Sequence, residues 1–311
     1  MTELKNHHAV RGHEPDSRST AKDESIEQLR KLIDARLAQL IPSDDTPPVS
    51  LHSAMSYTLL SPGKRLRPLL TLLTTLHFEG DMKASLDVSC AVEMIHAASL
   101  VIDDLPIMDD SSIRRGRPTT HVAFGQDVAI LASIGLLNRA FEVLSTTPAL
   151  PAELRIKLIS LFNASLGSDG LIAGQVMDLE LRSGTKVNEE LIKVNNLKTA
   201  ALFAAAAEAG AHIAGADAER VDAIRGFAFE LGAAFQIADD LIDDASYAGA
   251  TGKDTGRDNN KPTVVSRNGK DQAKKTLKHH LSLAHACLDR TKSSDQRLRK
   301  LMDEGFSVFL Q

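Results

Sequence analysis

The chain has 311 residues, of which 43% are hydrophobic and 25% charged, a composition typical of a globular protein with a sizeable core. Its formal net charge of −5 argues against a nucleic-acid-binding protein, because phosphate contacts demand a basic surplus. We expect no membrane span, since no uninterrupted apolar run has the length that crosses a bilayer. The two cysteines have neither metal-ligand spacing nor a disulfide framework, which favours a reducing, cytoplasmic location.

The amino-terminal segment differs in composition from the rest of the chain. Residues 1–23 are polar and lack the apolar core of a signal peptide. We therefore expect a disordered tail over 1–23 and a single domain over 24–311.

Apolar residues recur at intervals of three and four through the rest of the chain, as in Ile26, Leu29 and Ile33, which predicts helices with one buried face. The expected helices cover residues 26–40, 49–60, 82–104, 124–145, 151–167, 188–211, 217–245, 271–290 and 294–306, with one more starting near Pro68. The sequence has no convincing strand alternation. It predicts an all-α fold, a single-domain bundle of about ten helices around a central cavity.

A first acidic cluster ends the expected helix over 82–104. His96, Ser99 and Asp103 share one face of that helix. Pro106 should end it near Leu105. In an unbroken helix Asp109 would lie about 240° round from Asp103, whereas a loop after Pro106 can fold it back.

Asp103, Asp104, Asp109 and Asp110 gather at this helix end. A solvated acidic helix end explains a single pair of aspartates. Four carboxylates are harder to explain so, because the macrodipole there disfavours anions and two charges about 4 Å apart repel by roughly 4 kcal/mol at an effective dielectric of 20. Bound magnesium would remove that repulsion.

Arg114, Arg115 and Arg117 follow this cluster directly. Guanidinium groups bind phosphate bidentately. Surface ion pairs with the nearby aspartates are the alternative, and these would stabilise little.

A second acidic cluster lies in another apolar helical run, Phe235–Asp244, where Asp239 and Asp243 are one turn apart and Asp240 flanks them. A glycine-rich loop with Lys253 and Lys261 follows. Such a loop can close over an anion. A polar helix face followed by an ordinary connection is the alternative.

Other polar positions are ambiguous by themselves. Gly63–Arg67 places three cations at a helix start, where an anion site and a solvated turn are both reasonable. Lys198 opens an alanine-rich helix and could reach a phosphate or merely extend to solvent. His96 alone is more often a core histidine than a ligand. Gln175 and Asp178 could equally be buried with hydrogen-bond partners or contact a substrate.

Taken together, these segments resemble the trans-isoprenyl diphosphate synthases over nearly the whole chain after the tail. The matching motifs, in chain order, are Gly63–Pro68 (GKRxRP), Asp103–Asp109 (DDxxxxD), Arg114–Pro118 (RRGxP), Lys198-Thr199 (KT) and Asp239–Asp243 (DDxxD) after Phe235-Gln236. The sequence most resembles the bacterial geranylgeranyl diphosphate synthases of carotenoid pathways. The resemblance implies the isoprenoid synthase fold and a homodimer.

The resemblance also implies a role for each motif residue. Magnesium, three ions per active site, would be held by Asp103, Asp104, Asp109, Asp239, Asp240 and Asp243. The allylic diphosphate (dimethylallyl, geranyl or farnesyl) would contact Arg114, Lys198, Thr199, Gln236, Lys253 and Lys261. Isopentenyl diphosphate would bind at the element that starts with Gly63, through Lys64, Arg67, His96 and Arg115. Three features depart from the family pattern: Ile102 replaces a common histidine, Ser111 and Ser112 replace common acids, and the loop near Lys261 is short.

The implied reaction is magnesium-assisted ionisation of the allylic diphosphate, attack by isopentenyl diphosphate and proton loss. Ala98 and Ser99 lie about one turn before Asp103 and are small, which favours a long product, geranylgeranyl diphosphate. We predict that Ala98→Phe or Ser99→Phe shifts the product toward farnesyl diphosphate. The rival interpretations are a farnesyl diphosphate synthase, a terpene cyclase, a non-catalytic helical partner subunit and a plain helical scaffold.

Overall fold

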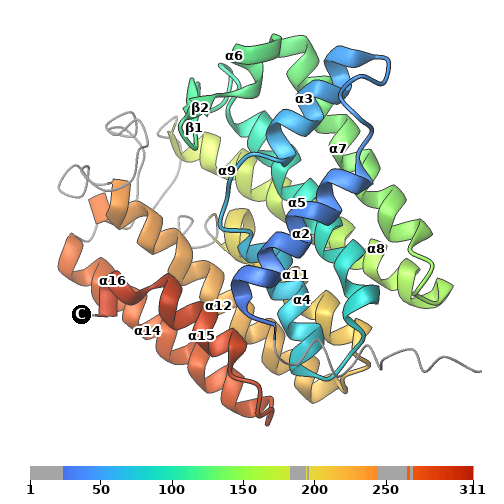
Figure 1. Cartoon of the computed structure of the whole chain (residues 1–311). Coiled ribbons are helices and arrows are strands. Elements are labelled where there is room, and N and C mark those ends of the chain that lie inside the picture. The colour runs from blue at the N-terminus through green and yellow to red at the C-terminus, as the bar shows by residue number, and fades with distance from the viewer. Residues whose placement is uncertain (1–23, 183–193, 195, 244–264, 267–268, 311) are drawn as a thin grey trace, which may run out of the picture.

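The computed structural model describes residues 24–182, 194, 196–243, 265–266 and 269–310. The expected tail over 1–23 and the loop with Lys253 and Lys261 lie outside the described residues. The described part is almost entirely helical (Figure 1), so the prediction of an all-α fold is confirmed.

The first described helix, α2 (Ile26–Leu40), begins where the sequence predicts it. Ser25 and Gln28 form a reciprocal capping box at its start, which satisfies backbone N–H groups that have no partner within the helix. Its buried residues are Leu29, Ile33, Leu37 and Leu40. This is the face that the spacing of three and four predicts.

The remaining helices follow in chain order. They are α3 (Val49–Leu59), α4 (Leu66–His77), α5 (Met82–Asp103), α6 (Thr120–Phe124), α7 (Gln126–Thr146), α8 (Ala152–Leu166), α9 (Leu171–Arg182), the π-helix η1 (Asn196–Ala200), α11 (Ala201–Ile213), α12 (Ala218–Asp243), α14 (Lys270–Arg290), α15 (Arg297–Gly305) and α16 (Ser307–Leu310).

Helices α4, α5 and α11 form the middle of the bundle (Figure 1). α5 packs on α7 and α4, and α11 packs on α4 and α12. α14 covers α12 on one side, and α3 and α8 lie against α7 on the other. The bundle therefore places the ends of α5 and α12, where the aspartates stand, on elements that pack around α4 and α11.

The alanine-rich helix α11 approaches α4 closely, as its composition predicts. A Cβ at Gly210 would lie 2.3 Å from the carbonyl oxygen of Thr71, so only glycine fits. The Thr71 hydroxyl donates to the carbonyl of Ala206 at 2.8 Å. Buried threonines on α4 thus use the α11 backbone as a partner.

Three details differ from the expected elements. A small antiparallel hairpin, β1 (Ile113–Arg114) and β2 (Arg117–Pro118), is present where no strand was expected. A separate helix, α9, follows α8. The helix expected over 124–145 begins as α7 after Gly125, whose φ of 91° separates it from the short α6.

Helices α5 and α7 are long and apolar enough to cross a membrane by length and composition alone. The apolar window of α5 is 67% buried inside the protein, and that of α7 is 39% buried. A core helix of a soluble protein passes the same test, and α5 has the burial of such a helix.

Candidate active site

The loop after α5 folds back onto the end of that helix. The Asp109 amide donates to the Asp103 carbonyl at 2.9 Å, and the Ser111 amide donates to the Asp104 carbonyl at 3.2 Å. The prediction that the loop after Pro106 returns Asp109 to the first aspartates is therefore confirmed. The helix ends at Asp103, two residues before the expected end.

Asp103 carries a perturbed carboxyl group. Its pKa is raised to about 6, chiefly by burial; the negative charge of Asp109 adds to this rise, whereas Lys198 and Arg114 oppose it. A carboxylate that is hard to ionise in a dry, acidic surrounding gains from a cation close by. Asp103 is therefore suited to hold a metal ion.

Asp104 faces Arg114 instead. The guanidinium Nε donates to both carboxylate oxygens at 2.9 Å, and Nη2 donates to Oδ1 at 2.7 Å. Burial raises the pKa of Asp104, although the bonds from Arg114 oppose this. Both residues line a pocket between α3, α5 and the hairpin. The structure thus pairs two residues that the sequence assigned to a metal and to a diphosphate.

The hairpin gives Arg115 its direction. Arg115 and Gly116 form the two-residue turn, with φ of 53° and 74°, the positive values of a type I′ turn. The turn places the Arg115 guanidinium over Gly63, where an added Cβ would lie 2.7 Å from Nη1. Arg115 Nη1 lies 3.5 Å from the Ser61 carbonyl, and burial lowers the pKa of Arg115.

The two cations of the Gly63–Arg67 element that were predicted to bind substrate rest on aromatic rings. Lys64 Nζ lies 5.6 Å from the ring centroid of Phe235, and Arg67 Cζ lies 4.6 Å from that of Phe203. Such contacts favour a cation at each ring. The two rings are themselves 5.7 Å apart, so Lys64 and Arg67 are held beside each other.

Arg67 and His96, predicted to bind the same diphosphate, are in contact. Arg67 Nη1 lies 3.1 Å from His96 Nε2. Burial lowers the pKa of His96 well below its ordinary value, and Arg67 and Arg115 lower it further. Burial also lowers the pKa of Arg67 to about 10. A neutral imidazole thus stands among cations, a surrounding that would attract an anion.

The second acidic cluster is linked to η1. The Thr199 hydroxyl donates to Gln236 Oε1 at 2.8 Å, and Gln236 Nε2 donates to Asp240 Oδ1 at 3.0 Å. These two hydrogen bonds, from Thr199 through Gln236 to Asp240, join η1 to α12. Asp243 ends α12, and its side chain lies outside the described part.

Lys198 of η1 interacts with residues of two other helices, α9 and α5. Its Nζ donates to Asp178 Oδ2 of α9 at 3.0 Å, and its charge also lowers the pKa of Asp103. It lies in the π-helical turn of η1, and π-turns recur at functional sites. The electrostatic influence of Asp239 on Arg67 likewise relates α12 to the first turn of α4. The structure therefore brings the predicted motif residues of five segments to one region.

The side chains of the site can be compared with the ligands that magnesium prefers. Within the described ranges, no group of three His, Cys, Asp or Glu side chains could hold an ion alone. Magnesium commonly takes one or two carboxylates and completes its shell with water and substrate phosphates. Half-buried Asp103 beside Asp109 is a donor set of that kind, so these residues fit the ion.

Sequence reasoning missed several partners at this site. Arg65 forms a buried ion pair with Glu93, Asp178 is the partner of Lys198, and Phe203 supports Arg67. The polar position of Asp178 in an apolar stretch was a usable indication. Glu93 gave a comparable one, because it stands in the apolar run of α5.

The site defines a class of protein, an all-α enzyme for diphosphate substrates. It combines carboxylates at one helix end, clustered arginines and lysines, and a second acidic helix. Comparison with known proteins makes this specific. Residues 48–304 match the polyprenyl synthetase family. The chain is 41% identical to the geranylgeranyl diphosphate synthase of Pseudescherichia vulneris, over 83% of this chain and 84% of that protein. It is 40% identical to the farnesyl diphosphate synthase of Geobacillus stearothermophilus, over 76% of this chain and 81% of that protein.

Solved structures agree. The apo structure of a FPP/GFPP synthase from Zymomonas mobilis superposes with a TM-score of 0.79 at 33% identity, over 94% of this chain and 98% of that one. The geranyltransferase of Helicobacter pylori, complexed with magnesium and isoprenyl diphosphate, gives 0.77 at 26% identity, over 97% and 98%. The chain belongs to the polyprenyl synthetase family and is a prenyltransferase. The family, fold and enzyme class predicted from the sequence are confirmed.

Proposed function

We propose that the protein is a geranylgeranyl diphosphate synthase, which condenses isopentenyl diphosphate with allylic diphosphates. The observation that carries the proposal is the gathering of two acidic helix ends and two separate groups of cations in one region. Relatives named geranylgeranyl diphosphate synthase, from Pseudescherichia vulneris and Pantoea ananas, support the product. A farnesyl diphosphate synthase is the second candidate, favoured by the 40% identity to the Geobacillus enzyme.

Each of the two groups of cations would bind one of the two substrates. Isopentenyl diphosphate would bind where Lys64, Arg67, His96 and Arg115 converge. The allylic diphosphate would bind between the aspartates and the remaining basic and polar residues, Arg114, Lys198, Thr199, Gln236, Lys253 and Lys261. Lys198, which is near enough to Asp103 to lower its pKa, would contact the leaving diphosphate.

Asp103, Asp109, Asp239, Asp240 and Asp243 would hold magnesium, and the magnesium in the Helicobacter pylori complex supports this use. Three ions per active site is our proposal for their number. The bound ions would supply positive charge where the leaving diphosphate develops negative charge. Asp104 would act mainly through Arg114, because both of its oxygens already accept from that guanidinium.

The chain's own residues would perform the remaining steps. Arg114 and Lys198 would orient the allylic diphosphate and stabilise the negative charge that bond cleavage leaves. Arg67 and Arg115 would hold isopentenyl diphosphate with its double bond toward the allylic carbon. We assign no side chain as the base, and the departed diphosphate would take the proton. Apolar walls would exclude water from the cation.

A homodimer is proposed from one surface. Ile130, Leu131 and Ile134 of α7 are 39%, 58% and 57% exposed, and neighbouring exposed apolar residues on one helix commonly mark an interface.

Cys90 and Cys287 are free thiols, and we propose the reducing cytoplasm as the location.

The test is product analysis. The purified chain is incubated with magnesium, labelled isopentenyl diphosphate and each of three primers, dimethylallyl, geranyl and farnesyl diphosphate. We expect label in a twenty-carbon product from all three, and no turnover in a chelator. Label that stops at fifteen carbons would make it a farnesyl diphosphate synthase. No consumption of the label would indicate a terpene cyclase or a non-catalytic subunit and overturn the proposal.

A further inference from the structure

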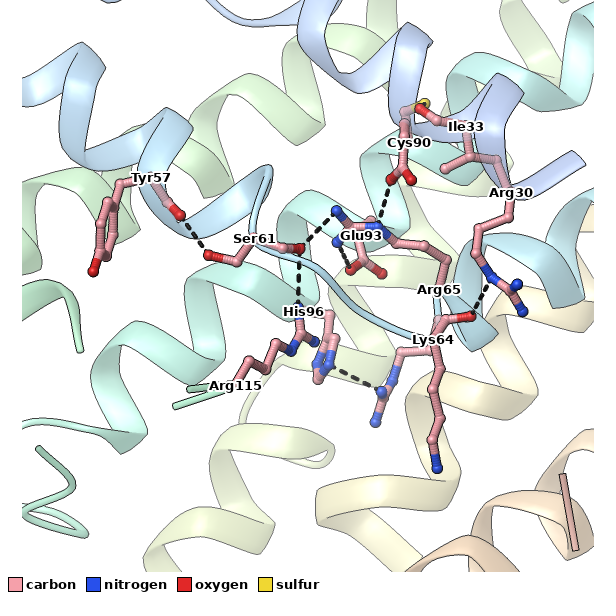
Figure 2. A network of polar contacts seen from close by, with 12 residues as sticks. Arg30, Ile33, Tyr57, Ser61, Lys64, Arg65, Cys90, Glu93, His96 and Arg115 are labelled. Carbon is pink, nitrogen blue, oxygen red and sulfur yellow. Dashed lines mark hydrogen bonds and ion pairs between the residues drawn. The ribbon is translucent and has the colours of Figure 1, made fainter. Parts of the chain in front are cut away.

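Unlike the exposed Lys64 and the half-buried Arg67, Arg65 is buried. Its side chain is 2% exposed, whereas Lys64 and Arg67 extend to the rings of Phe235 and Phe203. In Figure 2 the side chains of Arg65 and Lys64 leave the loop in different directions. A buried guanidinium needs several partners to offset its lost hydration.

Two helices and the loop itself supply those partners. Arg65 Nη1 donates to Glu93 Oε1 of α5 at 2.7 Å, Nε donates to Asp34 Oδ1 of α2 at 2.7 Å, and Nη2 donates to the Ser61 carbonyl at 2.9 Å. Glu93 is itself 4% exposed at its side chain. One residue therefore fastens the loop before α4 to α2 and α5.

The backbone at Arg65 is left-handed, with φ of 49° and ψ of 38°. Residues with a Cβ rarely adopt this conformation and keep it only where the surroundings impose it. The loop is also held at Lys64, whose carbonyl accepts from Arg30 Nε at 3.3 Å. The reversal at Arg65 separates the directions of Lys64, Arg65 and Arg67.

Each residue proposed to bind isopentenyl diphosphate is close to this pair. Lys64 adjoins Arg65 in the chain. Arg115 Nη1 shares the Ser61 carbonyl with Arg65, at 3.5 Å. Glu93 stands one helical turn before His96 on α5, and His96 contacts Arg67 at 3.1 Å.

We infer that the buried Arg65–Glu93 ion pair positions the isopentenyl diphosphate site, without touching the substrate. It fixes the loop so that Lys64 and Arg67 converge with His96 and Arg115 on one diphosphate. The inference rests on the proposed function, and it assigns to Arg65 and Glu93 a role separate from that of the binding cations.

A purely structural role is the competing explanation, because breaking a buried ion pair destabilises a protein whatever its function. The decisive variant removes both charges together, R65M/E93L, since apolar replacements of similar volume often preserve stability. The Michaelis constants for the two substrates are measured separately, with the thermal unfolding midpoint.

We expect a midpoint near that of the unmodified protein, a Michaelis constant for isopentenyl diphosphate raised about tenfold or more, and one for the allylic substrate within about twofold. The matched control is R36M/D87L. Arg36 Nε donates to Asp87 Oδ1 at 2.6 Å and likewise joins α2 to α5, whereas its Nη1 donates to Gln39 of α2 rather than to the loop. Both Michaelis constants should stay unchanged in that control.

An R65M/E93L protein that folds and keeps its Michaelis constant for isopentenyl diphosphate overturns the inference. Should that variant not fold, R65K decides: lysine keeps the charge near Glu93 but lacks the planar fork that reaches three acceptors. We expect R65K to raise the same constant about threefold, and an unchanged value overturns the inference.

Failure of the proposed function would look different. R67Q removes a proposed binding cation directly. If R67Q also leaves the constant for isopentenyl diphosphate unchanged, the assignment of the binding site is wrong. If R67Q raises it and R65M/E93L does not, only the positioning role of the ion pair is wrong.

Discussion

Asp104 holds Arg114 with both of its carboxylate oxygens, at 2.7 to 2.9 Å. The Asp104 side chain is 5% exposed and the Arg114 side chain 35% exposed, so the buried partner fixes the direction of the more exposed one. Charge-assisted, forked contacts of this kind are among the stronger hydrogen bonds in proteins. The second aspartate of the first motif therefore controls an arginine proposed to bind the allylic diphosphate.

Asp104→Asn should misplace Arg114, because the amide oxygen can accept only part of the fork and the amide NH₂ repels it. We expect kcat/KM for the allylic substrate to fall about 100-fold, with a smaller change for isopentenyl diphosphate. Steady-state kinetics with each substrate varied in turn measures this.

The control for Asp104→Asn is Asp110→Asn. Asp110 is exposed and has a φ of 48°, a conformation that asparagine tolerates well. Equal losses in both variants would contradict a special role for the pair of Asp104 and Arg114.

Gly63→Ala should weaken isopentenyl diphosphate binding without unfolding the protein. The new methyl group would lie 2.7 Å from Arg115 Nη1, and a guanidinium at the end of a flexible side chain can move away cheaply. The Michaelis constant for isopentenyl diphosphate should rise about tenfold, since a displaced bidentate donor loses roughly 1.4 kcal/mol of binding. Gly305→Ala, where nothing lies within 4 Å of the added methyl, should change neither activity nor stability.

Gly232→Ala should destabilise the fold and the second half of the site together. Its Cβ would lie 2.8 Å from Ala200 Cα and 3.2 Å from Phe203 Cβ, atoms that cannot move without shifting η1 or α11. We expect a loss of about 1–3 kcal/mol in the free energy of unfolding, measured by urea denaturation. Separation of η1 from α12 would also break the Thr199–Gln236 bond and lower kcat.

The comparison variant is Gly226→Ala on the same helix. Its methyl would meet only the Cys287 sulfur, at 3.1 Å. A larger loss of stability at Gly226 than at Gly232 would contradict the packing argument.

The sequence predicted well wherever a feature depends on local rules. The apolar spacing of α2 located its buried face, and the helix end expected at Pro106 correctly indicated that Asp109 can return to Asp103. The motif spacings identified the family. Each of these follows from periodicity or from a residue with a fixed backbone effect.

Features that depend on tertiary contacts were not predictable. The hairpin beside Arg115 has two-residue strands, too short for alternation to be recognised. The inward direction of Arg65 depends on Glu93 and on a left-handed backbone that nothing in its residue type requires. Likewise, only the folded chain shows that Asp104 contacts Arg114.

His77 should contribute to a loss of stability in mild acid. This residue is buried at the end of α4, and its Nε2 lies 2.8 Å from the Thr291 hydroxyl. Burial lowers its pKa, although Asp295 opposes this. The unfolded chain binds a proton below pH of about 6.5 and the folded chain resists it, so stability present above that pH is lost as the pH falls.

His77→Gln should therefore reduce the difference between thermal unfolding midpoints at pH 7.5 and 5.5. The matched control is His279→Gln, at an exposed position of α14, which should leave that difference as it is in the unmodified protein. A His77→Gln protein with the full acid sensitivity would exclude His77 as its source.

Ser99 is the better position at which to test product length. Ala98 is fully buried, and its carbonyl accepts from the Ser133 hydroxyl of α7 at 2.9 Å, so Ala98→Phe would overpack the contact between α5 and α7 and cost about 1–3 kcal/mol. Ser99 is only partly buried, and its hydroxyl donates within the helix to the His96 carbonyl. A ring there would not be forced into the contact between α5 and α7.

Ser99→Phe should therefore keep the unfolding midpoint of the unmodified protein and shift the product from twenty toward fifteen carbons. Ala98→Phe should show the same shift in a less stable protein. Chromatography of products made from a geranyl primer measures both, and Ser99→Ala, which adds no volume, should keep the original distribution. If Ser99→Phe gives the product distribution of the unmodified chain, the hydrocarbon tail does not pass this face of α5, and length is set on another helix.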